Sequence, residues 1–329
     1  MLDAILLAGG YGTRLRPLTY TRPKPLLPVA GRPMVDWVLD RLPRQVDHLI
    51  AAVNWQADAL RKHFADLAKE KQGMEFTVVE EDEPLGTAGA VKHAQRKMRS
   101  DRFFVLNADI VSTMDLAAML RQHEATGAVG TIALKEVAHA DVVNFGVVRP
   151  DEKDPRRIRG FVEKPKTPGM APSRLVNAGA YLLEGSVMGL IPSGRMVSME
   201  TEVFPQLLEK GFYGYRFDGT WIDVGDPARL RQASRILDPH FAVGPGADLA
   251  ADCRWVDSIG GANVRVASGA VVERCVLGDG VTVQANVKLR DCIVGDGEIV
   301  GHDATNARIW TGRPPAGYPE KQVGNPLKA

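Results

Sequence analysis

The chain has 329 residues, of which 45% are hydrophobic and 25% charged, a composition that excludes a fibrous or extensively disordered protein. Lys and Arg number 41 and Asp and Glu 40, so no overall charge attracts the protein to nucleic acid or to an anionic membrane. The first residues carry an acid and a short apolar run, unlike a signal peptide, and no run of apolar residues approaches a membrane span. We therefore expect a cytoplasmic protein with no nucleic-acid or membrane partner.

Up to about residue 235, short apolar runs alternate with stretches of helical period, which is typical of a layered α/β domain. Strands are expected at residues 4–7, 48–53, 76–79 and 103–106, because these runs are short, apolar and bounded by turn or charge signals. Helices are expected at residues 34–42, 57–68, 87–98 and 116–123, where apolar residues recur three and four apart. The order predicts a Rossmann-like, doubly wound and mostly parallel sheet.

A six-residue period takes over after residue 239. Val281, Val287, Ile293 and Ile299 recur every sixth residue, and two further series run beside and before them. This hexapeptide period is typical of a short left-handed parallel β-helix, here with about three coils; an antiparallel sandwich would show turns about 8 to 12 residues apart. We predict a catalytic domain at 1–238, the β-helix at 239–311, and a loosely packed or partner-bound tail at 312–329.

Three cysteines lie in the last quarter of the chain, at positions 253, 275 and 292. Their spacing matches no zinc-binding or CxxC pattern. We expect inert thiols.

A glycine-rich segment follows the first predicted strand. It reads Leu7-Ala8-Gly9-Gly10-Tyr11-Gly12-Thr13-Arg14, and Arg22-Pro23-Lys24-Pro25 comes shortly after it. Glycines at a strand end let backbone N–H groups approach an anion closely, and Arg14 and Lys24 add positive charge. The segment fits neither the Walker pattern nor the dinucleotide-binding pattern, but glycines followed by Thr, Arg and Pro-Lys-Pro form a specific motif.

At this motif the chain resembles the sugar-1-phosphate nucleotidyltransferase family, most closely its mannose-1-phosphate guanylyltransferases, and the resemblance extends over nearly the whole chain. It implies that Arg14 and Lys24 contact a nucleoside triphosphate, with Arg14 near the leaving pyrophosphate. The expected nucleotide-binding residues are Leu7, Ala8, Gly9, Gly10, Gly12, Thr13, Arg14, Lys24, Glu81, Gly86, Thr87 and Asp109. Surface cations after a turn are the structural alternative for Arg14 and Lys24.

Two acids are expected to hold a catalytic Mg²⁺ ion. Asp109 follows a predicted strand, where ligands of open α/β sheets collect, and Asp223 lies in the segment 221–227. The resemblance pairs them as metal ligands, and magnesium takes one or two carboxylates beside phosphate oxygens and water. Either residue alone could instead serve a turn or a helix cap.

The resemblance also implies a site for a sugar 1-phosphate. Lys164 would bind the phosphate, Glu163 and Asn177 would hydrogen-bond sugar hydroxyls, and Gly146 would let the backbone approach the sugar. The expected catalytic residues are Arg14, Lys24, Asp109, Lys164 and Asp223. A solvated Glu-Lys edge is the alternative for residues 163–164.

Glu81 lies in a segment, residues 81–89, that resembles the family's base-reading loop. An ionised carboxylate accepts hydrogen bonds and suits the two N–H donors of guanine, although the single N–H of uracil could donate to it too. We expect Mg²⁺-dependent, in-line condensation of GTP with mannose 1-phosphate to GDP-mannose and pyrophosphate. The alternatives are a glucose-1-phosphate enzyme that uses UTP or dTTP, a heptose-1-phosphate enzyme that uses GTP, and a catalytically silent regulatory subunit that senses nucleotide-sugars.

The β-helix is expected to be an assembly surface, because its terminal coil exposes strand edges that need covering. We therefore expect a homo-oligomer. An additional acyl transfer by the β-helix is disfavoured, since the repeat is short and its one histidine, His302, lies at the end.

Overall fold

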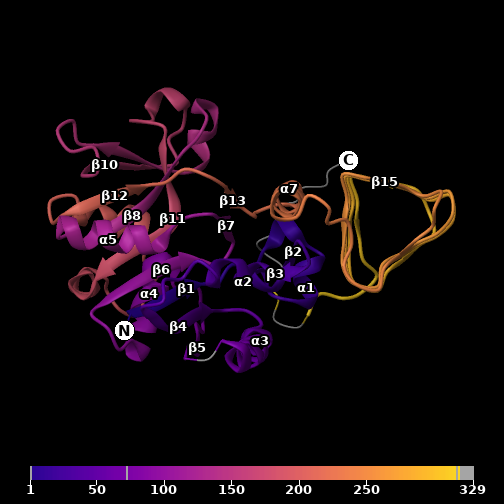
Figure 1. Ribbon diagram of the computed structural model, residues 1–329, viewed down its shortest axis with the longest axis horizontal. Coiled ribbons are helices and arrows are strands. Elements are labelled where there is room, and N and C mark those ends of the chain that lie inside the picture. The colour runs from indigo at the N-terminus through magenta and orange to yellow at the C-terminus, as the bar shows by residue number, and fades with distance from the viewer. Residues whose placement is uncertain (1, 72, 316–317, 319–329) are drawn as a thin grey trace. The chain divides into compact units, whose positions relative to one another are not determined.

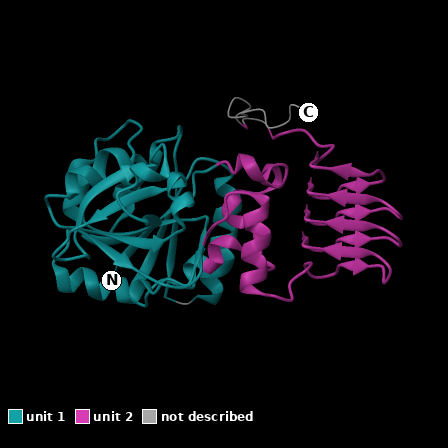
Figure 2. Ribbon diagram, turned by 90° about the horizontal axis from the view of Figure 1, so that it is seen from above, with its two compact units in different colours: residues 1–10, 38–221 teal, residues 11–37, 222–329 magenta. Residues whose placement is uncertain are grey.

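The computed structural model describes residues 2–71, 73–315 and 318. The chain divides into two compact units, Met1–Gly10 with Val38–Trp221 and Tyr11–Trp37 with Ile222–Ala329 (Figure 2). It crosses between them within the glycine-rich segment, within α2 (Met34–Leu39) and within β13 (Trp221–Asp223). Residue 238, where the sequence places the end of the catalytic domain, lies inside the second unit. The domain boundaries expected from the sequence therefore stay a prediction.

A nine-stranded sheet forms the centre of the first unit (Figure 1). Its order is β10-β9-β11-β6-β1-β4-β5, with β8 beside β11 and β12 beside β8. The parallel part consists of β1 (Leu2–Leu7), β4 (Val46–Val53), β5 (Glu75–Glu80) and β6 (Arg102–Asn107). These are the four expected strands; β1 and β4 begin two residues earlier than expected, and β5 and β6 are one residue longer at each end.

The other half of the sheet is largely antiparallel. It consists of β8 (Gly130–Glu136), β9 (Gly146–Pro150), β10 (Ile158–Glu163) and β11 (Leu175–Glu184), while β12 (Phe212–Arg216) runs parallel to β8. A parallel neighbour needs a long crossover, usually a helix, and a short loop joins β9 to β10. The sheet is thus parallel where strands and helices alternate in the sequence, and mixed as a whole.

Helices follow the parallel strands. α3 (Ala57–Glu70) packs on β5, α4 (Gly86–Ala94) on β1 and β4, and α5 (Leu116–Thr126) on β8, β11 and β12. The expected helices are confirmed, although two are shorter: α2 ends at Leu39, and α4 gives way to the turn η3 (Gln95–Lys97). The remaining short elements are β7 (Ile110–Ser112), α6 (Phe204–Leu207), the π-helical η7 (Met199–Val203), and the 3₁₀ turns η4 (His139–Asn144), η5 (Pro168–Met170) and η6 (Gly185–Leu190).

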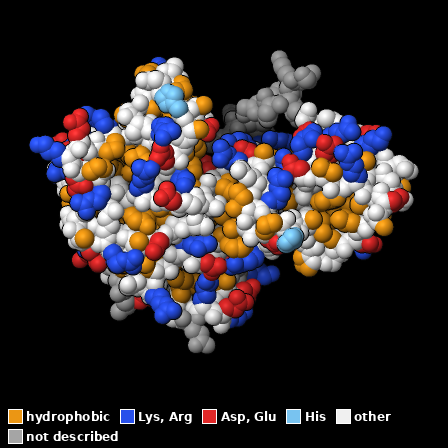
Figure 3. Space-filling view, turned by 45° about the horizontal axis from the view of Figure 1, so that its top comes forward, with side chains coloured by type: hydrophobic (Ala, Val, Ile, Leu, Met, Phe, Trp, Pro, Cys, Tyr) orange, Lys and Arg blue, Asp and Glu red, His pale blue; other side chains and the backbone are white. Residues whose placement is uncertain are grey.

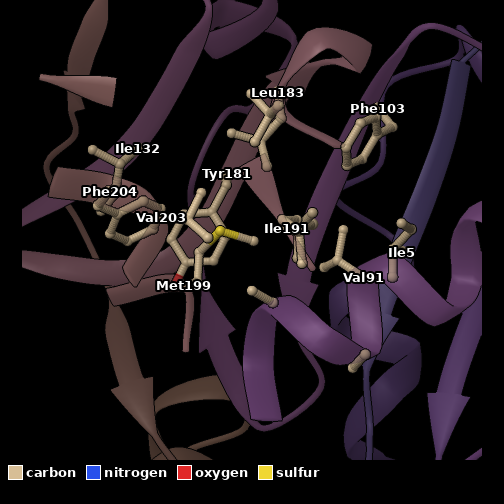
Figure 4. Close-up of a cluster of buried hydrophobic side chains, with 14 of the residues drawn as sticks. Ile5, Val91, Phe103, Ile132, Tyr181, Leu183, Ile191, Met199, Val203 and Phe204 are labelled. Atoms are coloured by element: carbon tan, nitrogen blue, oxygen red, sulfur yellow. The ribbon is translucent and has the colours of Figure 1, made fainter. Parts of the chain in front are cut away.

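The main core of the first unit is aromatic around β11 and α6. Tyr181 is 1% exposed and packs edge-on against Phe204, with ring centroids 5.1 Å apart (Figure 4). Burying a side chain of this size contributes roughly 1.5 to 3 kcal/mol. The buried hydroxyl of Tyr181 accepts a hydrogen bond from Nδ2 of Asn177 at 2.9 Å, so the core fixes one of the expected sugar-binding residues.

The second unit joins residues 11–37, called the motif segment below, to the C-terminal part of the chain. Its first pieces are η1 (Thr13–Leu15), α1 (Leu18–Thr21), η2 (Lys24–Leu26), β2 (Pro28–Val29) and β3 (Arg32–Pro33). α7 (Pro227–Leu237) packs on β2, and Ser234 Oγ accepts the N–H of Ala30 at 3.1 Å. Asp226 caps α7 by accepting the N–H of Arg229 at 2.9 Å.

The predicted parallel β-helix is confirmed. Three four-stranded parallel sheets form its faces, so it has four coils rather than about three. The faces are β14 (Asp248–Leu249), β17 (Arg265–Val266), β20 (Thr282–Val283) and β23 (Ile299–Val300); β15 (Arg254–Val256), β18 (Val271–Glu273), β21 (Lys288–Arg290) and β24 (Ala304–Thr305); and β16 (Ile259–Gly260), β19 (Val276–Leu277), β22 (Ile293–Val294) and β25 (Arg308–Ile309).

The coil length changes one detail of the expected repeat. Most paired positions on neighbouring coils, such as Val266 and Val283, are 17 residues apart, one short of three hexapeptides; pairs at β24 and β25 are 15 apart. A strict six-residue series therefore slips by one residue per coil, which moves a side chain to the other face of its strand. Accordingly Ile299, which the series places inward, is 68% exposed, whereas Val300 is buried.

The predicted tail is described at residues 312–315 and 318, and its other positions lie outside the described residues. Tyr318 is 6% exposed. Its hydroxyl donates to the carbonyl oxygen of Tyr11 at 3.0 Å, and the guanidinium of Arg16 stands 4.5 Å from its ring centroid. The tail therefore contacts the motif segment at this residue.

The remaining features bear on the expected surface and thiol chemistry. All three cysteines are free. In the described part of the chain, every helix lacks the length and the apolar run that crossing a bilayer requires. Figure 3 shows acidic and basic side chains interspersed over the face that it presents, in keeping with their balanced numbers.

Candidate functional site

A pocket of about 280 Å³ opens in the first unit where the parallel strands end. β1, β4, β5 and β6 are each followed by residues that line it, because the carboxyl ends of parallel strands meet at one edge of the sheet. Its lining consists of Leu7, Gly9, Gly10, Ala52, Asn54, Glu81, Pro84, Gly86, Thr87, Ala90, Asn107 and Asp109. Seven of the expected nucleotide-binding residues are thus brought together: Leu7, Gly9, Gly10, Glu81, Gly86, Thr87 and Asp109. Ala8 lies between two of them and is buried.

Glu81 is an unusual acid for such a position, because it is 7% exposed. One of its oxygens, Oε2, accepts the N–H of Leu85 at 3.0 Å, which holds the side chain in the loop before α4. Burial raises the pKa of Glu81 above the ordinary value of a carboxyl, against the smaller opposing effect of that hydrogen bond. A carboxylate has about four acceptor positions, so Glu81 keeps capacity for ligand donors.

The loop before α4 depends on a glycine. Gly86 has a φ of 72°, and a β-carbon there would lie 2.7 Å from the carbonyl oxygen of Val197. That carbonyl accepts the N–H of Ala88 at 3.0 Å. A side chain at position 86 would therefore be strained by both its backbone conformation and its close neighbour.

Thr87 links this pocket to the π-helical turn η7. Its Oγ1 donates to Oε2 of Glu200 at 2.8 Å and accepts the N–H of Met199 at 2.8 Å. Ser198 Oγ donates to the same oxygen of Glu200 at 2.9 Å. π-helical turns are rare and often occur at functional sites, and this one holds an acid beside Thr87.

The expected sugar-phosphate residues also lie in the first unit. Gly146 and Glu163 face each other across the antiparallel pair β9 and β10, and a β-carbon on Gly146 would lie 2.6 Å from Oε2 of Glu163. Lys164 has a φ of 43°, a left-handed conformation that is uncommon for lysine. Its Nζ lies 3.7 Å from Oε1 of Glu163, and its side chain is 65% exposed.

Glu163 combines burial with unused acceptor capacity. Within the described part of the chain, no group hydrogen-bonds to its buried Oε2. Burial and, second, the negative charge of Glu200 raise the pKa of Glu163, against the opposing effect of Lys164. Glu163 is therefore suited to accept a hydrogen bond from a ligand hydroxyl.

Asn177 stands at a break in the strand pairing. The register of β11 against β8 shifts between Asn177 and Tyr181, and Gly179 has a φ of 71°. Oδ1 of Asn177 accepts the N–H of Gly179 at 2.9 Å, while its Nδ2 donates to Tyr181. Bulges of this kind re-aim side chains next to active sites, and here both ends of the amide are held.

The expected cationic residues lie in the second unit. Gly12 has a φ of 63°, and a β-carbon there would lie 3.2 Å from Cβ of Lys24. The carbonyl oxygen of Gly12 accepts the hydroxyl of Thr19 at 3.1 Å. Lys24 is 8% exposed, so the glycine turn and the Pro-Lys-Pro turn are packed together.

The side chains of Arg14 and Asp223 both lie close to Gly225, in the second unit. A β-carbon on Gly225 would lie 2.5 Å from Nη2 of Arg14 and 3.3 Å from Oδ1 of Asp223. Arg14 follows Thr13 in η1 and is exposed. The structure therefore brings together Gly12, Thr13, Arg14, Lys24 and Asp223 in this unit.

The two expected metal ligands belong to different units, Asp109 to the first and Asp223 to the second, so their pairing stays a prediction. Among the described residues, no group of three His, Cys, Asp or Glu side chains could hold a metal ion. Two carboxylates with phosphate oxygens and water are a set that Mg²⁺ accepts. Asp109 lines the pocket, so the donor chemistry fits an ion that arrives with a triphosphate.

Several residues of the site were missed from the sequence, among them Asn54 and Glu200. Asn54 directly follows β4 and lines the pocket, and its buried Oδ1 has no hydrogen-bond partner among the described residues. Its position after a buried strand, like that of Asp109, was a signal that could have identified it. Glu200 had no such signal, because η7 has neither a strand nor a helix period.

Comparisons with known proteins identify the family of this chain. A family model described as nucleotidyl transferase matches residues 3–238. A mannose-1-phosphate guanylyltransferase of Mycobacterium tuberculosis is 34% identical over 307 residues, which cover 86% of this chain and 82% of that protein. Mannose-1-phosphate guanylyltransferase 1 of Arabidopsis thaliana is 32% identical over 327 residues, covering 92% and 87%. The mannose-1-phosphate guanyltransferase of Saccharomyces cerevisiae is 38% identical over 230 residues, covering 69% and 62%.

Among solved structures, a UDP-glucose pyrophosphorylase complexed with UDP-glucose aligns with a TM-score of 0.64 and 22% identity, over 72% of this chain and 98% of that one. A UDP-glucose pyrophosphorylase from acinetobacter baumanii aligns with a TM-score of 0.64 and 23% identity, over 73% and 95%. These likenesses show the shared fold. With a family match over most of its length and relatives at 32% to 38% identity, the chain belongs to the nucleotidyl transferase family, among the relatives of mannose-1-phosphate guanylyltransferases.

Proposed function

We propose that this protein condenses GTP with mannose 1-phosphate to form GDP-mannose and pyrophosphate. The names of its relatives support the reaction, and the observation that carries the choice of nucleotide is the buried carboxylate of Glu81 in the pocket at the strand ends. Guanine presents two adjacent N–H donors, and an ionised carboxylate is an acceptor that can take both.

Each substrate has its own set of residues in this proposal. The triphosphate is bound by the backbone of residues 7–13 and by Arg14 and Lys24, whose charges offset those of the phosphates. The sugar 1-phosphate is bound by Lys164 at the phosphate and by Glu163 and Asn177 at the hydroxyls. The close approach of Gly146 to Glu163 supports this assignment, since a larger residue at 146 would displace that carboxylate.

Asp109 and Asp223 would hold Mg²⁺ together with the triphosphate. The ion supplies charge neutralisation on the phosphates that react and leave. Asp109 is suited to this role by its place beside the glycine loop in the pocket. Asp223 is suited to the same role because its carboxylate and the guanidinium of Arg14 both lie close to Gly225.

The chemical step needs no base from the protein. The second pKa of a phosphate monoester is about 6, so the sugar phosphate is largely dianionic at neutral pH and its oxygen is ready to attack. A bond forms between that oxygen and the α-phosphorus, and the bond from the α-phosphorus to the oxygen that bridges it to the β-phosphorus breaks, releasing pyrophosphate. The protein's task is to bring two anions together in line, which positioning and fixed positive charge accomplish.

The direct test measures pyrophosphate release by purified protein with GTP, ATP, UTP or dTTP and a panel of sugar 1-phosphates. GTP with mannose 1-phosphate should give the highest kcat/KM. Preference for UTP or dTTP with glucose 1-phosphate, or for GTP with a heptose 1-phosphate, would replace the substrate assignment. Binding of GDP-mannose without any turnover would support the regulatory alternative.

The proposal includes a homo-oligomer formed through the β-helix. Ile299 on β23 is 68% exposed, and apolar side chains beside open strand edges favour association. Removing the whole β-helix would also remove the partners of the motif segment, so a point change is the sharper test. Ile299→Asp should lower the mass measured by light scattering, and an unchanged mass would exclude this surface.

A cytoplasmic location is also part of the proposal. Both substrates are multiply charged, and charged groups enter the apolar layer of a membrane at high cost. The enzyme is therefore expected in the compartment where these substrates are made. Fractionation of cells that express a tagged protein tests the location.

A further inference from the structure

The motif segment of the second unit is tied to the β-helix by an ion-pair cluster. Nη2 of Arg22 lies 2.7 Å from Oδ2 of Asp279 and 2.7 Å from Oδ2 of Asp296. Thr21 Oγ1 adds a hydrogen bond to Asp296 at 2.6 Å. The side chain of Arg22 is 26% exposed, so this cluster is less screened than a fully exposed ion pair.

Hydrogen bonds within the β-helix also hold the two acids, Asp279 and Asp296. Asp279 and Asp296 occupy equivalent corners of consecutive coils, 17 residues apart, and Oδ1 of Asp296 accepts the N–H of Asp279 at 2.8 Å. Oδ1 of Asp279 in turn accepts the N–H of Ala262 on the coil before, at 2.9 Å. Each carboxylate therefore has one oxygen fixed to the β-helix and the other bound to Arg22, which makes the anchor rigid.

A second contact joins the β-helix to the backbone at Arg14. Arg308, on β25, donates from Nη1 to the carbonyl oxygen of Thr13 at 3.1 Å and from Nη2 to that of Arg14 at 3.2 Å. The ring of Tyr20, which lies between Arg14 and Arg22 in sequence, packs on that of Trp310 of the C-terminal part, with centroids 4.6 Å apart. The β-helix thus binds the motif segment at two places. Arg308 binds the backbone of Arg14, and Asp279 and Asp296 bind the side chain of Arg22, two residues before Lys24.

We propose that Arg22 and Arg308 are positioning residues of the transferase reaction, and that the β-helix holds Lys24 and Arg14 in the geometry that binds the triphosphate. The proposal rests on the proposed function of those two cations. Pro23 stands between Arg22 and Lys24 with its φ restrained by its ring, so a displacement at Arg22 is passed on to Lys24. Misplacing a binding group by about 1 Å can cost about a hundredfold in rate.

The test compares Arg22→Ala, Arg22→Lys, Arg308→Ala and a control, Arg265→Ala, which removes an exposed arginine of β17. Pyrophosphate release should show kcat/KM for GTP reduced by about ten- to a hundredfold in Arg22→Ala and Arg308→Ala. KM for mannose 1-phosphate should change little, because its proposed residues belong to the first unit. Arg22→Lys should recover part of the loss by keeping a cation between the two acids, and Arg265→Ala should match the wild type.

Hydrogen exchange of peptides covering residues 11–24 gives a readout that needs no activity. Both alanine variants should raise exchange there by roughly tenfold or more, since local opening becomes easier, while peptides of the first unit stay unchanged. Exchange that matches the wild type in both variants would overturn the positioning role, whether or not the enzyme turns over. An inactive wild type with the predicted exchange changes would instead overturn the proposed function alone. Arg308→Ala, at an exposed residue, keeps the test valid if Arg22→Ala fails to fold.

Discussion

Gly225 lies so close to Arg14 that a β-carbon at residue 225 would be 2.5 Å from Nη2 of the arginine. The atom in the way is the end of a long side chain rather than backbone, so the chain can fold around an alanine while Arg14 moves aside. Gly225→Ala should therefore leave the midpoint of thermal unfolding nearly unchanged and lower turnover by about a hundredfold.

The matched control is Gly189→Ala, at an exposed glycine where a β-carbon would meet nothing within 4 Å. Its pyrophosphate-release kinetics should equal those of the wild type. Wild-type activity in Gly225→Ala would show that Arg14 need not occupy its observed place.

Thr87→Val should weaken both stability and catalysis. The change removes the donor to Glu200 and leaves the N–H of Met199, at a fully buried residue, without its acceptor. An unsatisfied buried donor costs about 1 to 3 kcal/mol, which denaturant unfolding can measure. Thr87→Ser keeps the hydroxyl and should recover most of the free energy of unfolding. A Thr87→Val variant as stable as the wild type would show that these two hydrogen bonds do not stabilise the fold.

Glu81→Gln should separate function from stability. Losing the charge weakens the hydrogen bonds to guanine, and charge-assisted bonds are worth roughly 1.5 to 3 kcal/mol, so kcat/KM for GTP should fall about ten- to a hundredfold. KM for mannose 1-phosphate should stay nearly constant. Glu83→Gln, at an exposed acid two residues later, is the control.

The pH dependence of stability gives Glu81 a second test. Its folded-state pKa is raised, so the folded protein holds this proton more tightly than the unfolded chain, and the ionised side chain costs stability at pH values above the raised pKa. Glu81→Gln should therefore increase the midpoint of thermal unfolding at neutral pH, with a gain that shrinks as the pH falls through the folded-state pKa towards the unfolded one. A decrease at neutral pH would show that the ionised carboxylate stabilises the loop.

Chelation should abolish activity, and added Mg²⁺ should restore it. Asp223→Asn should raise the Mg²⁺ concentration needed for half-maximal turnover, or abolish turnover, because an amide lacks the charge that holds the ion. Asp226→Asn is the matched control, since Asp226 caps α7 and asparagine caps a helix equally well. Activity in the presence of EDTA would remove the metal from the mechanism.

The sequence by itself determined the parallel half of the sheet, the β-helix and the edge of the sheet at which the pocket opens. Strand and helix periods are local properties, and the ends of parallel strands necessarily meet. Gly9, Glu81 and Asp109 therefore share one pocket, as their positions after predicted strands require. The antiparallel pairing of strands β8 to β11 could not be predicted in this way, because a strand's direction depends on its connections rather than on its own residues.

The tertiary structure alone decided the contacts between distant residues. Glu200 reaches Thr87 across 113 positions, and Arg22 reaches Asp296 across 274. Neither pair has a period or spacing that links its members, so each arises from how whole elements pack. The exposure of Ile299 has a similar origin: the hexapeptide pattern predicts an inward side chain, but the 17-residue coil turns it outward, because the facing of a residue depends on how each coil closes upon the one before.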